Sequence, residues 1–568
     1  MTTRIPRHLR RFLPALALVC ATSTARPATI TIVNLDGAGE GFNDPTAASP
    51  VGGNAGTTVG QQRLLVFQQA ASIWGGILPS SVQILVNSYF NALTCTSTSA
   101  VLGSAGAASI LRDFSGAEFA GTWYPKALAD KLSGTDLNPG SSDITAQFNS
   151  SIGNTGCMDG YSWYYGFDHN EGASQIDLLA VVLHELGHGL GFATYVNGTT
   201  GTLNGGYPDV FCRFLYDQNT GLHWNEETNA QRAASAIVPF QLTWDGAATR
   251  FMAPNTLQSG RPVLRVNAPP AVAGDYAVGT ASFGAALTGT GVTGAVVLAD
   301  DGVAPTSDAC SALVNAAQVA GKIALVDRGT CSFVIKVKAC QDAGAIGVIV
   351  ADNAAGAPPA GMGGTDATIT IPSVRVTQAD GVTLKAQLAS GLSATLQVDP
   401  ALLAGADPQG RVMMYTPNPF QSGSSVSHFD VSCTPDLLME PAINSDLTSN
   451  VDLTRYVFED IGWLPRTTGV APGAPAAVAA LRPNAPNPFA RSTSIRFDVP
   501  READTRLDVC DVAGRAVRAL LHERFPAGSH VVIWDGTGDD GRRLHGGVYF
   551  TRLAVDGEVR SRQVVLVQ

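Results

Sequence analysis

One short stretch limits what this chain can fold into more than any other: His184-Glu185-Leu186-Gly187-His188. On a helix, two histidines four residues apart lie on the same face, with the glutamate beside the first. This spacing suits two ligands of a zinc ion and a general base. Because the chain has only 9 His and 47 acidic residues in 568 positions, about 0.01 accidental matches to this pattern are expected. The stretch therefore predicts a helix of a metallopeptidase.

The surrounding residues favour a site over a plain core helix. Ile176 to Leu183 are apolar enough to be buried, and Ser174 with Asp177 three residues later predicts an N-cap. Gly187, Gly189 and Gly191 follow, and each glycine within a helix costs about 1 kcal/mol relative to alanine. Such glycines suit a close approach of other chain segments and a turn that ends the helix.

Two histidines do not complete a catalytic zinc site, which usually has three protein ligands. A compact pattern would place the third histidine at position 194, but this residue is Thr194. His8 lies in the N-terminal segment, and the last three histidines lie in a separate C-terminal region. The remaining candidates are His169, His223 and His428, with Asp209 as a carboxylate alternative.

A later part of the chain carries a family resemblance. Ser424–Asp430, Asp436–Pro441 and Tyr456–Trp463 resemble the second half of a leishmanolysin-type metzincin active site. The resemblance implies that His428 is the third zinc ligand and that Met439 forms the Met-turn beneath the metal. A helix over Gln61–Trp74 and strands over 82–86 and 143–148 fit the upper part of such a domain.

These residues imply a mechanism. Neutral His184, His188 and His428 would hold one catalytic Zn²⁺, and Glu185 would take a proton from the attacking water. We therefore expect a secreted zinc endopeptidase that hydrolyses a protein or peptide substrate. The alternative is a cell-surface adhesin or binding protein whose metallopeptidase fold is inactive or incidental. The sequence does not indicate whether a structural Ca²⁺ ion is also bound.

The first 25 residues have the features of a signal peptide. Four arginines precede the apolar run Phe12–Ala21, and Ser23-Thr24-Ala25 offers small residues for cleavage. The run is too short to span a membrane. We expect a secreted or surface-attached protein without a transmembrane span.

The number of cysteines is consistent with an exported protein. Without Cys20, the chain keeps eight cysteines, an even number that favours disulfides in an oxidising compartment. We expect Cys95 to pair with Cys157, and Cys212 with Cys433. One further pair is expected among Cys310, Cys331 and Cys340, which leaves a thiol that either pairs with Cys510 or stays free.

Composition and charge indicate a multidomain α+β protein. The 61 Gly, 32 Pro and 15% charged residues are typical of many turns and β-structure. The net charge of -11 argues against a nucleic-acid partner. We predict a metzincin-like peptidase domain in two parts, residues 26–266 and 401–464, which are separated by an inserted domain over residues 267–400.

The inserted domain shows a strand, a helix and a strand over Gly321–Phe333, Lys336–Ala345 and Ile346–Val350. It resembles the protease-associated (PA) domain, a small α/β domain that carries no catalysis and is thought to gate or recruit substrate. For Asp327 and Arg328 we expect a salt bridge in a turn and no chemistry.

After a Pro- and Ala-rich linker over residues 465–487, the C-terminal region 488–568 contains short alternating strands such as Ser494–Val499 and Gly547–Phe550. This pattern predicts an immunoglobulin-like β-sandwich. The region resembles the flagellar-hook-capping-type module and the C-terminal sorting domains of bacterial secreted proteins. It implies attachment to the cell surface or contact with bacterial secretion machinery.

Overall fold

The computed structural model describes residues 26–567, except 357–358, 360, 445–446, 448, 465–478, 483, 485–486, 490–492, 502, 526–527, 535 and 540–541. The predicted signal peptide and most of the predicted linker lie outside the described residues. The chain forms two compact units, Met1–Pro465 and Arg466–Gln568. In the described part, no helix has the length and hydropathy that a bilayer span requires.

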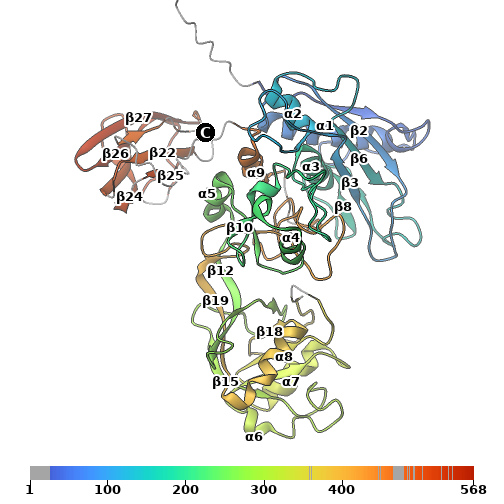
Figure 1. Ribbon diagram of the computed structural model, residues 1–568, viewed down its shortest axis with the longest axis vertical. Helices are drawn as coiled ribbons and strands as arrows, with labels where there is room; N and C mark the ends of the chain where they lie inside the picture. Colours follow the sequence, from blue (N-terminus) through green and yellow to red (C-terminus); the bar gives the residue numbers. More distant parts are fainter. Residues whose placement is uncertain are drawn as a thin grey trace, which may run out of the picture. The chain divides into compact units, whose positions relative to one another are not determined.

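The first unit begins with a four-stranded sheet in the order β1-β2-β6-β3. β1, β2 and β6 run parallel, whereas β3 is antiparallel to β6 and forms one edge. Helices α1 and α3 pack against each other and against the sheet (Figure 1). The bounds are β1 (Ile30–Asn34), α1 (Val59–Ile77), β2 (Ile84–Asn91), β3 (Gly103–Ala107), β6 (Ile144–Asn149) and α3 (Leu178–Leu190).

The alternation of buried and half-buried residues along β2 explains its place inside the sheet, since every second side chain faces the helices. Thr58 begins α1, because its hydroxyl oxygen accepts a hydrogen bond from the Gln61 amide at 3.2 Å. The predicted helix and both predicted strands are confirmed. Short elements complete this part: β4 (Ile110–Leu111), β5 (Tyr124–Pro125), α2 (Lys126–Ser133), β7 (Ser162–Tyr164) and β8 (Gln175–Asp177).

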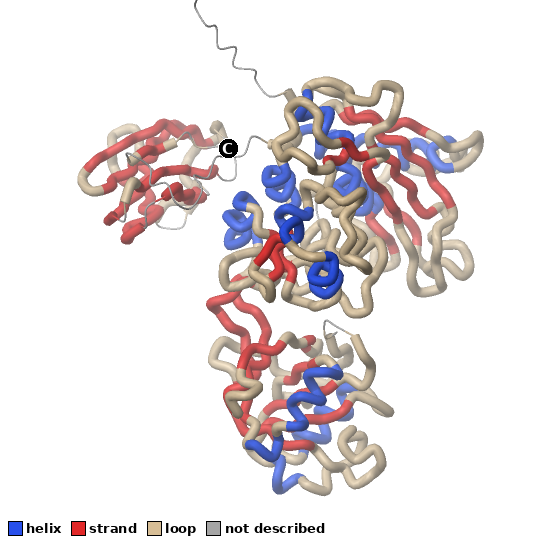
Figure 2. The backbone as a smooth tube through the Cα atoms, in the orientation of Figure 1, coloured by secondary structure: helices blue, strands red, loops and turns tan. Residues whose placement is uncertain are grey.

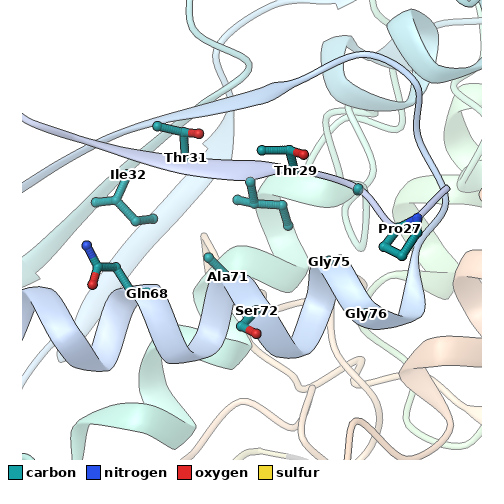
Figure 3. Close-up of a pocket in the computed structure, with 11 residues that line it drawn as sticks. Pro27, Thr29, Thr31, Ile32, Gln68, Ala71, Ser72, Gly75 and Gly76 are labelled. Atoms are coloured by element: carbon teal, nitrogen blue, oxygen red, sulfur yellow. The ribbon is translucent and has the colours of Figure 1, made fainter.

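A hollow of about 560 Å³ lies between β1 and the second half of α1. Gln68 and Ala71 of α1 point toward β1 in Figure 3. At Gly75 a Cβ atom would stand 2.5 Å from the Ala28 carbonyl oxygen, so only glycine allows the helix this close. None of the candidate metal ligands lines this hollow.

A small sheet in the order β10-β9-β11-β20 joins the parts of the chain before and after the inserted domain. Asp460 of α9 strengthens this junction, because its carboxylate accepts hydrogen bonds from the Trp244 indole at 3.0 Å and the Ala248 amide at 2.7 Å. Burial raises the pKa of Asp460 to about 6. The bounds are β9 (Leu215–Asp217), β10 (Leu222–His223), α4 (Asn229–Ser235), β11 (Leu242–Trp244), α5 (Ala247–Thr256), β20 (Val412–Met413) and α9 (Thr454–Ile461).

The inserted domain is built on an eight-stranded mixed sheet in the order β13-β12-β19-β15-β16-β17-β18-β14. Its first and last long strands, β12 and β19, pair antiparallel, so the chain leaves and returns side by side. Helices α7 and α8 lie beside the parallel strands in Figure 2. The bounds are β12 (Ser259–Ala268), β13 (Gly274–Tyr276), β14 (Gly279–Thr280), β15 (Val292–Leu298), α6 (Ala316–Val319), β16 (Ile323–Asp327), α7 (Phe333–Asp342), β17 (Gly347–Ala351), β18 (Ser373–Val376), α8 (Gln378–Ala386) and β19 (Ser393–Leu403).

The predicted strand, helix and strand of this domain are confirmed as β16, α7 and β17. The expected Asp327–Arg328 pair does not form. Asp327 is paired with Lys385, and Arg328 with Asp352. The partners are 58 and 24 residues away in the sequence, so a reading of adjacent residues could not find them.

The second unit has two antiparallel sheets in its described part, in the orders β21-β22-β25 and β24-β23-β26-β27. They share one apolar core that includes Phe497, Leu507 and Trp534. Two sheets around one core are the arrangement expected of the predicted β-sandwich. The bounds are β21 (Ala480–Leu481), β22 (Thr493–Val499), β23 (Ala503–Cys510), β24 (Ala516–Phe525), β25 (Gly528–Trp534), β26 (Gly547–Val555) and β27 (Glu558–Leu566).

Two disulfides are present, Cys95–Cys157 and Cys310–Cys331. The first confirms a predicted pair, and the second is one of the pairings expected among the three central cysteines. The predicted Cys212–Cys433 pair is wrong, since both are buried thiols. The Cys212 thiol donates to the Asp209 carbonyl and the Cys433 thiol to the Gly405 carbonyl, so each has its own partner.

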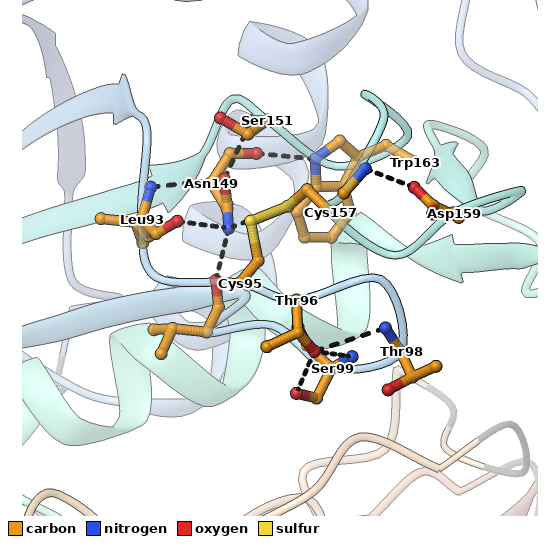
Figure 4. The surroundings of a disulfide bond; sticks show 12 residues. Leu93, Cys95, Thr96, Thr98, Ser99, Asn149, Ser151, Cys157, Asp159 and Trp163 are labelled. Carbon is orange, nitrogen blue, oxygen red and sulfur yellow. Dashed lines mark hydrogen bonds between the residues drawn. A yellow bond between two sulfur atoms is a disulfide. The ribbon is translucent and has the colours of Figure 1, made fainter.

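The Cys95–Cys157 disulfide holds the segment that leads from β2 to β3. Asn149 lies beside it and donates to the Val101 carbonyl at 2.9 Å (Figure 4). A Cys95→Ser/Cys157→Ser double variant should lose about 2–4 kcal/mol of stability, because the bond closes a long loop in the unfolded chain. Urea unfolding without reductant tests this value. An unchanged midpoint would contradict the expected role of the bond.

Candidate metal centre

Helix α3 carries the first two candidate ligands. It begins after Asp177, whose carboxylate accepts a hydrogen bond from the Leu179 amide at 2.8 Å. The predicted N-cap Ser174 is therefore wrong, because strand β8 occupies the intervening residues. The helix ends at Gly191, whose φ of +126° favours glycine. Every residue of α3 is buried.

The structure brings three histidines together at one point. The Nε2 atoms of His184 and His188 are 3.1 Å apart, and the Nε2 atom of His428 lies 3.1 Å from that of His188 and 3.2 Å from that of His184. All three side chains are buried. Two of them come from α3 and the third from a segment 240 residues later.

Backbone carbonyls fix the protonation of these imidazoles. The Nδ1 atoms of His184, His188 and His428 lie 2.7–2.8 Å from the carbonyl oxygens of Leu438, Phe192 and Ser424. Since a carbonyl only accepts, each Nδ1 carries the proton and each Nε2 presents a lone pair to the shared point.

Burial also keeps the three rings neutral. It lowers the pKa of His184 to about 3 and that of His188 to about 4, and the neighbouring His188 ring adds to the effect at His184. The pKa of His428 is also well below its ordinary value for the same reasons. Neutral imidazole is the form that binds a metal ion.

The donor set fits a zinc ion. Three imidazole ligands of a tetrahedral zinc at about 2.0–2.1 Å would stand about 3.3–3.4 Å from one another, close to the separations found here. Carbonyl partners on the far nitrogen are the usual second layer of such sites. Among the described residues, this is the one group of three or more His, Cys, Asp or Glu side chains that is close enough to hold a metal.

Glu185 lies next to the first ligand and faces the edge strand. Glu185 is only 8% exposed, and its carboxylate accepts a hydrogen bond from the Ala105 amide of β3. Burial raises the pKa of Glu185 to about 8 in the metal-free protein. A carboxylate with a high proton affinity beside a metal site is suited to general base catalysis.

Met439 packs against α3, the helix that carries two of the candidate ligands, at Gly187. A Cβ atom on Gly187 would stand 2.7 Å from the Met439 sulfur, so the glycine allows this contact. Two buried indoles hold the same helix: Trp74 donates to the Leu183 carbonyl at 3.0 Å, and Trp463 donates to the Leu190 carbonyl at 2.8 Å. The three side chains hold α3 in place through their contacts with Gly187, Leu183 and Leu190.

Replacing Gly187 by alanine should destabilise the protein by about 1–3 kcal/mol, because the new methyl group must displace the buried Met439 side chain. Thermal unfolding measures this loss. Gly76→Ala in α1 is the matched control, since nothing lies within 4 Å of its added Cβ atom, and it should stabilise the helix by about 0.5–1 kcal/mol. Equal effects of the two changes would contradict the proposed contact.

The other candidate ligands lie elsewhere. His169 is bonded to Asp177 and Ser449, and His223 pairs with Asp245. Asp209 is buried and accepts from the Thr194 hydroxyl at 2.8 Å. None of the three belongs to the metal cluster.

Sequence reasoning missed the partners that orient the ligands. The Leu438, Phe192 and Ser424 carbonyls belong to the backbone, which every residue has, so no side-chain pattern could have revealed them. The Ala105 amide of β3 was missed for the same reason.

Comparison with known families gives two matches. Residues 292–384 match the PA domain family, which confirms the predicted PA domain. Residues 53–208 match a family described as SPBPB7E8-like, and this range includes α1, β6 and α3.

Several of the similar proteins are aminopeptidases. Leucine aminopeptidase 2 of Trichophyton rubrum is 38% identical over 89 residues, 16% of this chain and 18% of that protein. The probable lipoprotein aminopeptidase LpqL of Mycobacterium tuberculosis is 34% identical over 131 residues, 23% of this chain and 24% of that protein. The chain thus spans about a quarter or less of the length of these relatives. A zinc aminopeptidase from Bacillus subtilis matches 25% of this chain and 31% of its own, with 25% identity and a TM-score of 0.19.

These findings correct the family prediction. The chain matches the PA family model and resembles aminopeptidases such as leucine aminopeptidase 2 and LpqL. The leishmanolysin-type assignment is therefore wrong, and a metzincin domain is not shown. The assignment rested on short segments around the histidines and Met439. A set of site residues of this kind indicates the chemistry of the site. It does not identify the protein family, because similar sites occur on different folds.

Proposed function

We propose that this chain is a zinc-dependent peptidase. His184, His188 and His428 hold one Zn²⁺, and Glu185 is the general base. The convergence of three Nε2 lone pairs in a buried site carries this proposal. The peptidase activity of the matched relatives supports the class of reaction.

The protein side chains have distinct tasks in this mechanism. Zinc at the three histidines would polarise the scissile carbonyl and lower the pKa of water to about 7. Glu185 takes a proton from the attacking water and returns it to the leaving amine. The Ala105 amide orients the carboxylate for this transfer. Met439 and the two indoles keep the helix, and hence the ligands, in one position.

We further propose cleavage within a chain. β3 pairs only with β6 among the described strands, so no strand covers its other edge, on which the Ala105 amide already donates to Glu185. An extended peptide can add to such an edge through backbone hydrogen bonds, whatever its sequence. This mode of binding needs no free terminus, which favours an endopeptidase.

An aminopeptidase is the second candidate, and the names of the matched relatives favour it. A substrate without a free amino terminus separates the two. The zinc-loaded protein should cleave an internally quenched peptide that is blocked at both ends, and it should leave leucine p-nitroanilide intact. EDTA should stop the cleavage and added zinc should restore it.

Other outcomes of this assay are equally clear. Cleavage of leucine p-nitroanilide alone would establish the aminopeptidase and overturn the endopeptidase. If neither substrate is cleaved by protein with one zinc per chain, the peptidase proposal fails, and a binding protein with an inactive site remains. Mass spectrometry of the products locates the bond that is cut.

We also propose that the peptidase works outside the cytoplasm. The predicted signal peptide supports export, and the two disulfides suit an oxidising compartment. The C-terminal sandwich would attach the enzyme to the cell surface or contact the secretion machinery. Cell fractionation of a strain expressing the full chain tests the location.

A further inference from the structure

Outside the metal centre, three side chains form a short chain of hydrogen bonds. The Nδ1 atom of His169 lies 2.5 Å from the Asp177 carboxylate, and its Nε2 atom lies 2.7 Å from the Ser449 hydroxyl. The side chains of Asp177 and His169 are only 5% and 15% exposed. His169 joins segments that are 280 residues apart, since Ser449 follows the inserted domain.

Both ends of this chain lead to His184. At one end, the second oxygen of Asp177 caps α3, the helix that carries His184. At the other end, Ser449 lies three residues before Asp452, which accepts a hydrogen bond from the Leu438 amide at 2.5 Å. The carbonyl of the same Leu438 accepts the Nδ1 proton of His184. His169 thus links the cap of α3 to the segment around Ser449 and Asp452. These are the two structures that orient His184.

The backbone of His169 indicates that this contact is held against a conformational cost. Its φ is +51°, in the left-handed region that residues with a side chain rarely adopt. Such conformations persist where the surrounding structure imposes them. Here the imidazole is fixed by partners at both nitrogens.

We propose that His169 is a positioning residue, which braces the start of α3 against the Ser449 segment and thereby sets the orientation of His184. This inference rests on the proposed zinc site. A Ser-His-Asp sequence of bonds is also the arrangement of serine hydrolases. Because Asp177 caps the helix that carries two of the candidate ligands, the positioning role is favoured over a serine hydrolase.

Four variants test the brace. His169→Ala removes both bonds. His169→Asn keeps a donor near the position of Nδ1 and tolerates the left-handed backbone, but it cannot reach Ser449. Ser449→Ala removes the same bond from the other side. His223→Asn is the matched control, because His223 also bonds an aspartate, but that aspartate is Asp245 and not Asp177, the cap of α3.

The cobalt-substituted full chain gives a readout that a purely structural role would not change. His169→Ala should weaken Co²⁺ binding about tenfold and alter the visible absorption bands, because the Leu438 carbonyl that orients His184 loses its support. It should lower kcat about tenfold with KM within twofold. Ser449→Ala and His169→Asn should each show a smaller change, and their combination should be no worse than either alone. His223→Asn should match the wild type.

Several results would overturn the brace. Unchanged cobalt affinity and bands in His169→Ala would do so, as would additive effects of the two single changes. Covalent labelling of Ser449 by a fluorophosphonate in the Glu185→Gln background would show a nucleophilic serine instead. If His169→Ala does not fold, the two milder variants decide the question. If the wild type cleaves no peptide, the peptidase proposal fails, while the cobalt measurements still test the brace.

Discussion

Replacing Glu185 by glutamine should reduce peptide hydrolysis by about 10²- to 10⁴-fold, the usual contribution of a general base. Glutamine keeps the shape of the side chain but cannot accept the proton of the attacking water. Because Glu185 is not one of the three proposed ligands, the variant should still bind one zinc per chain. Hydrolysis of casein and of the blocked quenched peptide, together with zinc content by atomic absorption, measures both effects.

Glu558→Gln provides the matched control. Glu558 is an exposed glutamate of the second unit, and its replacement should leave the rate unchanged. Full activity of Glu185→Gln with bound zinc would remove Glu185 from the mechanism. Loss of zinc in this variant would instead assign Glu185 a role as a ligand.

His428→Ala should lose both zinc and activity. Two histidines on one helix turn are an incomplete site, so we expect the affinity for zinc to fall by more than about 100-fold, beyond the usual cost of losing an outer partner of a ligand. A metal that binds only the folded state raises the free energy of unfolding. Added zinc should therefore raise the melting temperature of the wild type but not that of His428→Ala.

The control for this experiment is His223→Ala, which should keep zinc and the zinc-dependent rise in melting temperature. Asp209→Ala should also keep zinc, although it loses the buried hydrogen bonds that Asp209 makes and should be less stable. Zinc bound by His428→Ala but not by one of these variants would overturn the ligand assignment.

The sequence predicts the parts of this molecule whose signals are local. The spacing of His184 and His188 follows from the helical period, and the glycines after them correctly indicated close packing. Alternating and amphipathic segments predicted α1, β2, β6 and the core of the PA domain. The pairing of Cys95 with Cys157 was also predicted.

Features that depend on distant contacts were missed or wrongly assigned. Whether Cys212 meets Cys433 depends on the positions of two buried segments, and each thiol instead bonds a carbonyl close to it. The cap of α3 is Asp177 because strand β8 takes up the residues before it. The family could not be read from the residues near the metal, because similar metal sites occur on unrelated folds.

The chain leaves the catalytic region at β12 and returns to it at β19. The histidines of the candidate metal centre are therefore synthesised at two different times. During synthesis, His184 and His188 leave the ribosome 240 residues before His428. At about 5–20 residues per second, this gap lasts roughly 10–50 s. Throughout that interval the nascent chain has only two of the three proposed ligands. The order of the residues alone thus delays the proposed peptidase until its own catalytic region has been made.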